Sequence, residues 1–394
     1  MKLPERILTI DIMRGLTLFL MLFVNDLYVA GVPKWLTHTD AGFDGMGLAD
    51  WVFPGFLFMV GMAVPFAIQS RKNKGDTTFT IVKHIIIRTL SLLFIGVLML
   101  NTARVNPELT GMSKNGWAIS MYLCVFLVWN QYKIEPRWLP FILKAAGMGG
   151  LVVLLVMFRA GTAENPGWLI PGWWGILGLI GWGYLVAALV HLFVSGNMLK
   201  TGLWLLVFIL LNILSQLNLL SFPDGLNPVF GVLLEGNTPS IVIAGLFFSL
   251  LLLKYGKARF RIFIPVAVGL GILFLVLGFF LRQWFIISKI LGTPSWAFIC
   301  NGISILLFVV LFLLVDVWGI KKWSMVFVPA GRNSLTTYLA PDILYYSIWM
   351  TSLPVFFYKT TENPLLAVAG SLGWALLMIG FAAGLSRLGI RLKL

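Results

Sequence analysis

Charged residues are scarce in this chain, and their scarcity excludes an ordinary soluble fold. Only 11% of the 394 residues are Asp, Glu, Lys or Arg, whereas 59% are hydrophobic. A water-soluble domain of this length cannot bury so much apolar surface and still present a polar exterior. A lipid bilayer accepts such a surface, so the composition indicates a membrane protein.

Cysteine and the common enzyme signatures are also scarce or missing. The two cysteines, Cys124 and Cys300, lie in apolar runs, which predicts small hydrophobic residues rather than a disulfide framework. No Walker A, GxGxxG, GxSxG or HExxH pattern occurs, so the usual signatures of soluble enzymes give no assignment. No second His or Cys lies at ligand spacing from His38, and we therefore expect no metal site.

Long hydrophobic runs are what the chain has in abundance. Several reach the roughly 20 residues that a spanning helix needs, and they lack the alternation of β-barrel strands. We therefore predict an all-α polytopic membrane protein with 10–12 transmembrane helices, forming a single domain over residues 1–394. The fourth of the twelve predicted spans is short and the eleventh is interrupted by polar residues. The spans are 7–29, 51–69, 82–101, 117–130, 137–158, 173–194, 200–219, 238–254, 261–281, 296–317, 324–350 and 364–386.

The net charge of +14 follows the predicted topology. If the N-terminus is inside, nineteen Lys and Arg fall in inner segments, seven in outer segments and three within spans. The positive-inside rule then places both termini in the cytoplasm and the loop 30–50 on the outer side. We expect a multi-pass protein of the plasma or bacterial inner membrane. Lipid is then the expected surroundings, and no nucleic-acid partner is needed to explain the charge.

The first predicted helix carries a polar stripe. Asp11, Arg14, Leu18 and Asn25 project within about 60° of one another, and Arg14 and Asn25 are separated by roughly 16 Å along the axis. Ionisable groups within a span usually face the protein interior or a water-filled cavity. Asp11 and Arg14 could form an anchoring pair at the inner interface. Asn25 in line with them favours a polar path along this helix.

His38 is the one histidine predicted on the outer side, in an acidic loop that includes Asp44 and Asp50. Histidine suits proton transfer near neutral pH, so His38 is a candidate base and the two aspartates are candidate acceptor contacts. A solvated loop histidine is the alternative interpretation.

A second polar segment, "PAGRNSLTTYLAPD" at 329–342, interrupts the eleventh span near its inner end. Arg332 and an exposed helix start suit a phosphate or pyrophosphate from the cytoplasm. A helix start capped by Asn333 or Ser334 is the alternative.

These segments resemble the family of transmembrane N-acetyltransferases typified by heparan-α-glucosaminide N-acetyltransferase. The resemblance rests on "ERILTIDIMRGLTLFLMLFVN", the following His-bearing loop and "LADWVFPGFLFMVGMAVPFAI" over residues 5–68, and on "TPSWAFICNGIS", "DVWGIKKW" and "GRNSLTTYL" near the C-terminus. The middle of the chain is similar in hydropathy alone.

The resemblance implies transfer of an acetyl group from cytoplasmic acetyl-CoA to an amino sugar or other saccharide across the membrane. By motif, His38 would be the catalytic base or acetyl acceptor, and Asn25 would stabilise the thioester carbonyl. Asp11 and Arg14 match the family's D-x(2)-RG, and the family's N-S pair falls on residues 333 and 334, so with Arg332 they are candidate acetyl-CoA contacts. Dimers are usual in the family, which suggests a homodimer.

The loop after His38 departs from the family pattern. It is longer and more acidic, and Phe43 stands where tryptophan is usual. We expect acceptor choice to depend on this loop. Two other functions compete with acyl transfer: a secondary transporter of a sugar or peptide with a His38/Asp50 proton relay, and a scaffold whose outer loop contacts a partner.

Overall fold

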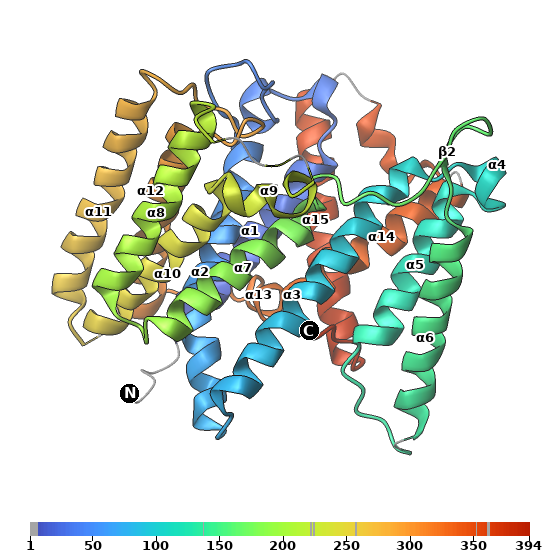
Figure 1. Ribbon diagram of the computed structural model, residues 1–394, viewed down its shortest axis with the longest axis horizontal. Helices are drawn as coiled ribbons and strands as arrows, with labels where there is room; N and C mark the ends of the chain where they lie inside the picture. Colours follow the sequence, from blue (N-terminus) through green and yellow to red (C-terminus); the bar gives the residue numbers. More distant parts are fainter. Residues whose placement is uncertain are drawn as a thin grey trace.

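A computed structural model describes residues 7–136, 138–220, 223, 225–256, 258–351, 353–360 and 363–394. The fold is an all-α bundle, as the hydropathy predicted (Figure 1). Its long helices are α1 (Leu8–Asp26), α2 (Leu48–Asn73), α3 (Thr78–Asn101), α5 (Lys114–Trp129), α6 (Trp138–Met157), α7 (Gly175–Phe193), α8 (Met198–Gln216), α10 (Asn237–Tyr255), α11 (Phe260–Leu281), α12 (Pro294–Phe312), α14 (Ser334–Thr351) and α15 (Pro364–Arg387).

Short elements connect these helices. They are α4 (Pro107–Thr110), α9 (Asn227–Leu234), α13 (Val328–Arg332), the 3₁₀ turns η1 (Val29–Gly31), η2 (Lys34–Leu36), η3 (Thr102–Arg104), η5 (Lys322–Ser324) and η6 (Pro354–Lys359), the π-helical turn η4 (Leu313–Val317), and a two-stranded antiparallel ribbon of β1 (Ala160–Gly161) and β2 (Pro166–Gly167).

Ten helices in the described part of the chain are long and apolar enough to cross a membrane, which agrees with the predicted range of 10–12. The two predicted spans outside this set are α5, which has 16 residues, and α14, which is 18 residues long and carries Pro341 and Asp342. The predicted span 324–350 is divided into η5, α13 and α14, with Asn333 in a non-helical conformation between the last two.

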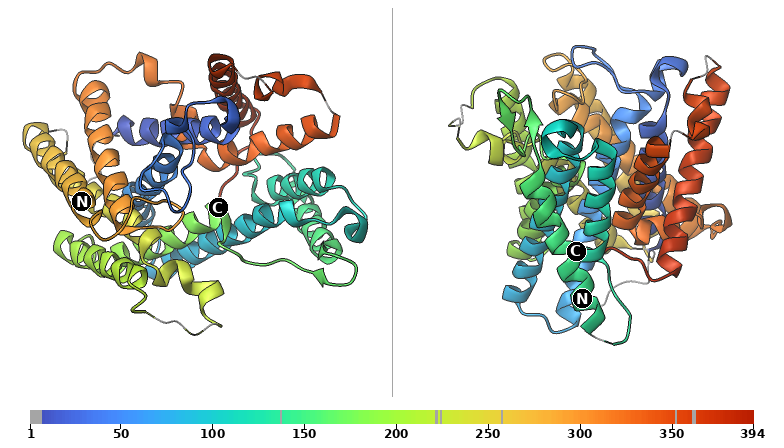
Figure 2. Two further views of the ribbon diagram at one scale, coloured as in Figure 1. Left: turned by 90° about the horizontal axis from the view of Figure 1, so that it is seen from above. Right: turned by 90° about the vertical axis from the view of Figure 1, so that its right-hand side faces the viewer.

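α14 nevertheless runs from one face of the bundle to the other. At its start, Arg332 lies beside Asp11 near the beginning of α1. Beyond its end, Tyr358 and Lys359 of η6 contact Asp26, the last residue of α1. α14 therefore crosses the bundle between the same two faces as α1. Seen from above (Figure 2), α8 and α11 lie at the opposite end of the molecule from α5 and α6.

Glycines bring α2 and α10 into backbone contact. A Cβ on Gly61 would lie 1.8 Å from the carbonyl oxygen of Val242, and a Cβ on Gly245 would lie 2.0 Å from that of Phe58. Because these distances are far below contact, only glycine allows the two helices to approach so closely. The crossing fixes α2, the helix that follows the His38 loop, within the bundle.

We expect Gly61→Ala to destabilise the protein by about 1–3 kcal/mol, because the added methyl group must push α2 away from α10. Thermal unfolding of the purified protein in detergent measures the effect. Gly380→Ala in α15 is the matched control, since a Cβ there meets nothing within 4 Å. An equal melting temperature for Gly61→Ala and the parent protein would contradict the packing argument.

Candidate functional site

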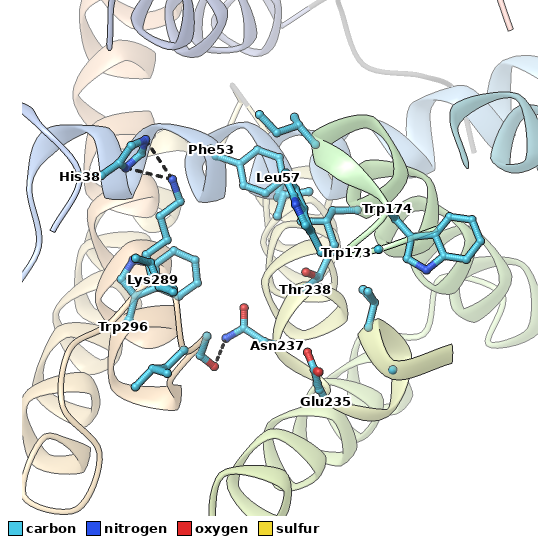
Figure 3. A pocket seen from close by; sticks show the side chains of 18 of the residues that line it. His38, Phe53, Leu57, Trp173, Trp174, Glu235, Asn237, Thr238, Lys289 and Trp296 are labelled. Carbon is cyan, nitrogen blue, oxygen red and sulfur yellow. Dashed lines mark hydrogen bonds between the residues drawn. The ribbon is translucent and has the colours of Figure 1, made fainter. Parts of the chain in front are cut away.

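A cavity of about 960 Å³ lies beside the His38 loop (Figure 3). Its walls come from the end of α1, the first half of α2, the start of α7, α9, the start of α10 and the segment that precedes α12. Asn25 and His38 both line it, although the sequence separates them by a turn of helix and a loop. The two residues singled out for catalysis therefore share one chamber.

His38 is paired with a buried acid. Its Nδ1 lies 2.7 Å from Oδ1 of Asp50, whose side chain is 0% exposed, while the His38 side chain is 47% exposed. The second oxygen of Asp50 accepts hydrogen bonds from the backbone N–H of Thr39 (3.1 Å), the Thr39 hydroxyl (3.0 Å) and the N–H of Gly47 (3.0 Å). An ionised carboxylate only accepts hydrogen bonds, so we assign the His38 proton to Nδ1 and a free lone pair to Nε2.

This geometry changes the part assigned to Asp50. It lies in the first turn of α2 rather than in the loop, and its bond to the Gly47 N–H caps that helix. Its four hydrogen bonds and its complete burial leave it behind His38, away from the cavity wall. Asp50 is thus placed to orient His38, and its contact with the acceptor stays a prediction.

The loop needs glycine at position 47 to bring these groups together. A Cβ on Gly47 would lie 2.0 Å from the carbonyl oxygen of Thr37, the residue before His38. The indole N–H of Trp296 also donates to the backbone carbonyl of Asp50 (3.2 Å), which ties the start of α2 to α12. Both contacts hold the His38–Asp50 pair at the rim of the cavity.

Asp44 braces the loop rather than facing the cavity. Its carboxylate accepts hydrogen bonds from the backbone N–H of Ile287 (2.8 Å) and from Nε of Arg282 (2.8 Å). The Ile287 N–H, with help from Arg282, holds the pKa of Asp44 below its ordinary value. Asp44 is absent from the cavity lining and joins the His38 loop to the segment before α12. Its contact with the acceptor stays a prediction.

Asn25 is held by its buried neighbour. Asn25 is exposed to the cavity, while the next residue, Asp26, is 0% exposed. Asp26 accepts a hydrogen bond from the Tyr358 hydroxyl (2.7 Å), forms an ion pair with Lys359 (2.7 Å), and its carbonyl accepts from the Ser371 hydroxyl (3.2 Å). These contacts fix the last turn of α1 and with it the position of Asn25.

Several residues of the cavity were not predicted. Lys289 lies beside His38, with Nζ 3.1 Å from Nδ1 and 3.5 Å from Nε2 (Figure 3). Trp173, Glu235 and Asn237 line other parts of the wall. Lys289 is 251 positions from His38, and no local pattern joins them. The one sequence signal for Lys289 was that it belongs to the seven Lys and Arg residues predicted to lie in outer segments.

The inner end of α1 forms a second polar cluster. Arg14 donates from Nε to the carbonyl of Gly331 (2.6 Å), and its Nη2 lies 3.4 Å from Asp11. Arg332 lies 3.5 Å from the other oxygen of Asp11. The Ser334 hydroxyl donates to the Gly331 carbonyl, and the remaining member of the predicted set, Asn333, donates its side-chain amide to the Pro329 carbonyl. The five candidate acetyl-CoA contacts thus lie together where α1 meets α13.

The polar path expected along α1 is interrupted. Leu18, which shares a face with Arg14 and Asn25, is 1% exposed and belongs to the apolar core. On α1 the cavity reaches Met21, and its lining includes neither Asp11 nor Arg14. The inner cluster and the outer cavity are therefore two separate regions, roughly 16 Å apart along the helix.

No group of three His, Cys, Asp or Glu residues that could hold a metal ion occurs within the described residues. The groups available in the cavity wall include a carboxylate-oriented imidazole, amides, an ammonium group and the carboxylate of Glu235.

Comparison with known proteins gives a family and two relatives. Residues 6–215, more than half of the chain, match the family model described as "Domain of unknown function (DUF5009)". The human heparan-α-glucosaminide N-acetyltransferase is 34% identical over 99 residues, and the mouse protein of the same name is 33% identical over 97. Each alignment covers 25% of this chain and 14% of the relative, so the chain spans a small part of those relatives' length.

Proposed function

The chain belongs to the DUF5009 family, and on that premise we propose that it is a transmembrane acetyltransferase. Its donor would be acetyl-CoA on the cytoplasmic side, and its acceptor an amino sugar or another saccharide on the outer side. The partial similarity to two N-acetyltransferases supports the class of reaction. The observation that carries the proposal is the placement of the His38–Asp50 pair and Asn25 in the walls of one cavity.

The acceptor proton would move through His38. Acetyl transfer breaks a C–S bond, forms a C–N or C–O bond and moves one proton from the acceptor to the leaving sulfur. With its Nδ1 proton donated to Asp50, His38 can take the acceptor's proton at Nε2 and return it to the thiolate. The same nitrogen could instead accept the acetyl group and pass it on in a second step.

Asn25 would stabilise the charge that develops on the acetyl oxygen. We expect Asn25→Ala to lower kcat by about 10²–10³-fold, the usual loss when a single oxyanion donor is removed. Initial rates with labelled acetyl-CoA, measured at saturating acceptor, test this expectation. Asn227→Ala is the control, because Asn227 lines the same cavity from α9. A loss for Asn227→Ala equal to that for Asn25→Ala would argue against a specific part for Asn25.

The inner cluster would hold the phosphates of acetyl-CoA. The Arg332 side chain is 46% exposed and that of Arg14 is 22% exposed, so Arg332 is the more accessible guanidinium. Guanidinium groups bind phosphate oxygens in a bidentate manner, and Asp11 positions both. The outer cavity, with Val24, Phe53 and Leu57 in its walls, offers the apolar surface that an acetyl group requires.

The proposal is tested by supplying acetyl-CoA to purified protein reconstituted in liposomes. Labelled acetyl-CoA on the side of the inner cluster, with glucosamine on the other side, should give acetylated sugar that mass spectrometry detects. A transporter would instead exchange labelled sugar across the bilayer with no acyl-CoA present. Exchange without any acetylated product would overturn the proposal in favour of the carrier.

A further inference from the structure

Lys289 brings a positive charge to the end of the cavity that holds His38. It lies in the segment before α12, is half-buried, and is the one Lys or Arg among the described residues that line the cavity. Its ammonium nitrogen is 3.1 Å from Nδ1 and 3.5 Å from Nε2 of His38 (Figure 3). The counter-charge is the buried carboxylate of Asp50, 2.7 Å from the same Nδ1. Burial lowers the pKa of Lys289, and the negative charge of Asp50 opposes that shift.

The two distances place the ammonium group over the face of the imidazole ring. A nitrogen in the ring plane at 3.1 Å from Nδ1 and 3.5 Å from Nε2 would overlap Cε1, the carbon between them. The in-plane lone pair of Nε2 therefore stays free, because the Nδ1 proton is donated to Asp50 and Lys289 approaches from one face. A base and a cation thus lie side by side without competing for one lone pair.

The position of Nε2 also determines where the leaving sulfur must lie. An acceptor atom that gives its proton to Nε2 has to be within hydrogen-bond distance of it, and the acetyl carbon that this atom attacks is bonded to sulfur. The sulfur is therefore within reach of the flexible Lys289 side chain, whose ammonium is 3.5 Å from Nε2. The acetyl oxygen already has the neutral amide of Asn25 as its proposed partner, whereas the sulfur must take up a full negative charge.

We propose that Lys289 is a second catalytic residue, whose ammonium group stabilises the thiolate that leaves from acetyl-CoA. This inference rests on the proposed acetyl transfer. As the acceptor gives its proton to Nε2 of His38, its nitrogen or oxygen bonds to the acetyl carbon, the C–S bond breaks and the electron pair stays on sulfur beside Lys289. The imidazolium proton then passes to sulfur, which releases CoA as the thiol and restores His38. If His38 attacks the acetyl carbon itself, sulfur still leaves next to Nε2.

The charges around His38 balance at each stage of this step. At rest the carboxylate of Asp50 and the ammonium of Lys289 cancel. After proton transfer the imidazolium and the thiolate add one charge of each sign. Because no net charge accumulates beside the buried carboxylate, the cost of desolvating charged groups there is kept low.

The experiment varies the leaving thiol and keeps the acetyl group and the acceptor, glucosamine, constant. S-acetyl-N-acetylcysteamine releases an alkyl thiol like that of CoA, whereas S-phenyl thioacetate releases the more acidic thiophenol, which leaves faster. Lys289→Met should lower kcat with acetyl-CoA and with the alkyl donor by about 10–100-fold, as expected for a lost hydrogen bond to a charged group. The loss with the phenyl donor should be about threefold or less. Lys289→Arg keeps the charge and should retain most of each rate.

Two further variants are controls, and Lys289→Gln replaces Lys289→Met if the latter does not fold. Lys34→Met removes an exposed lysine of the His38 loop that does not line the cavity, and it should change none of the rates. Asn25→Ala should lower the rates with the alkyl and phenyl donors alike, because both contain the same acetyl oxygen.

The pattern of losses separates catalysis by Lys289 from a structural part. Equal losses for the alkyl and phenyl donors in Lys289→Met, or an unchanged rate with acetyl-CoA, would overturn the inference and leave acetyl transfer intact. Absence of transfer by the parent protein from every donor would count against the proposed function, and the inference would be rejected with it.

Discussion

Replacing His38 with alanine should abolish measurable acetyl transfer while leaving acetyl-CoA binding intact. General acid–base catalysis contributes about 10²–10⁴-fold, and the loss will be larger if His38 also carries the acetyl group. The change should spare the fold, since the His38 side chain is 47% exposed. Product formation and equilibrium binding of labelled acetyl-CoA, measured on the same preparation, separate the two effects.

His84→Ala provides the comparison, because His84 is an exposed histidine on α3. It should retain the parent rate. An active His38→Ala protein would remove the basis for the proposed mechanism, whatever the behaviour of the control. Loss of acetyl-CoA binding together with activity would place His38 in donor binding rather than in proton transfer.

Asp50→Asn should lower kcat by about 10⁴-fold with little change in KM, since this is the loss seen when the carboxylate behind a catalytic histidine becomes an amide. An asparagine amide would donate to Nδ1 and shift the His38 proton to Nε2, which is the nitrogen that must be free. The isosteric change keeps a carbonyl oxygen that can accept from Gly47 and Thr39, so α2 should remain capped. Steady-state rates and the melting temperature distinguish a tautomer effect from unfolding.

Asp44→Asn is the matched control for this second change. Asp44 lies in the same loop, and its ion pair with Arg282 is partly exposed, so its contribution should be small in water. We expect a loss of a few-fold at most. If Asp44→Asn were as damaging as Asp50→Asn, the loop as a whole, and not the Asp50–His38 hydrogen bond, would account for both losses.

The fold was largely predictable because hydrophobic run length is a local property of the chain. Nearly all of the predicted spans coincide with helices. The short fourth span and the interrupted eleventh span correspond to α5 and α14, the helices that fall short in length or apolarity. The break at Asn333 was visible as a polar cluster in the sequence. The contacts of this cluster could not be predicted, because Arg332 and Asp11 are 321 positions apart in the sequence.

The site was predictable only in part. Asn25 and His38 follow from a helix end and a nearby loop, whereas the assignment of Asp44 and Asp50 to the acceptor treated the loop as an exposed chain. In the structure the loop folds back, and both carboxylates are used by backbone N–H groups and by neighbouring side chains. The interruption of the polar path at Leu18 could not be predicted either. Helical periodicity shows in which direction a residue projects from the axis, but not what packs against that side of the helix.

The glycine crossing of α2 and α10 has a mechanical consequence. Helices whose backbones touch at Gly61 and Gly245 cannot slide past each other by a turn without driving a side chain into a carbonyl group. They form a rigid frame that bears Asp50 at one end. If a long flexible donor is to pass Leu18, the displacement must therefore occur in α1 or in η6 and α15, which hold Asn25 through Asp26. One part of the protein would then stay still while the other admits the donor.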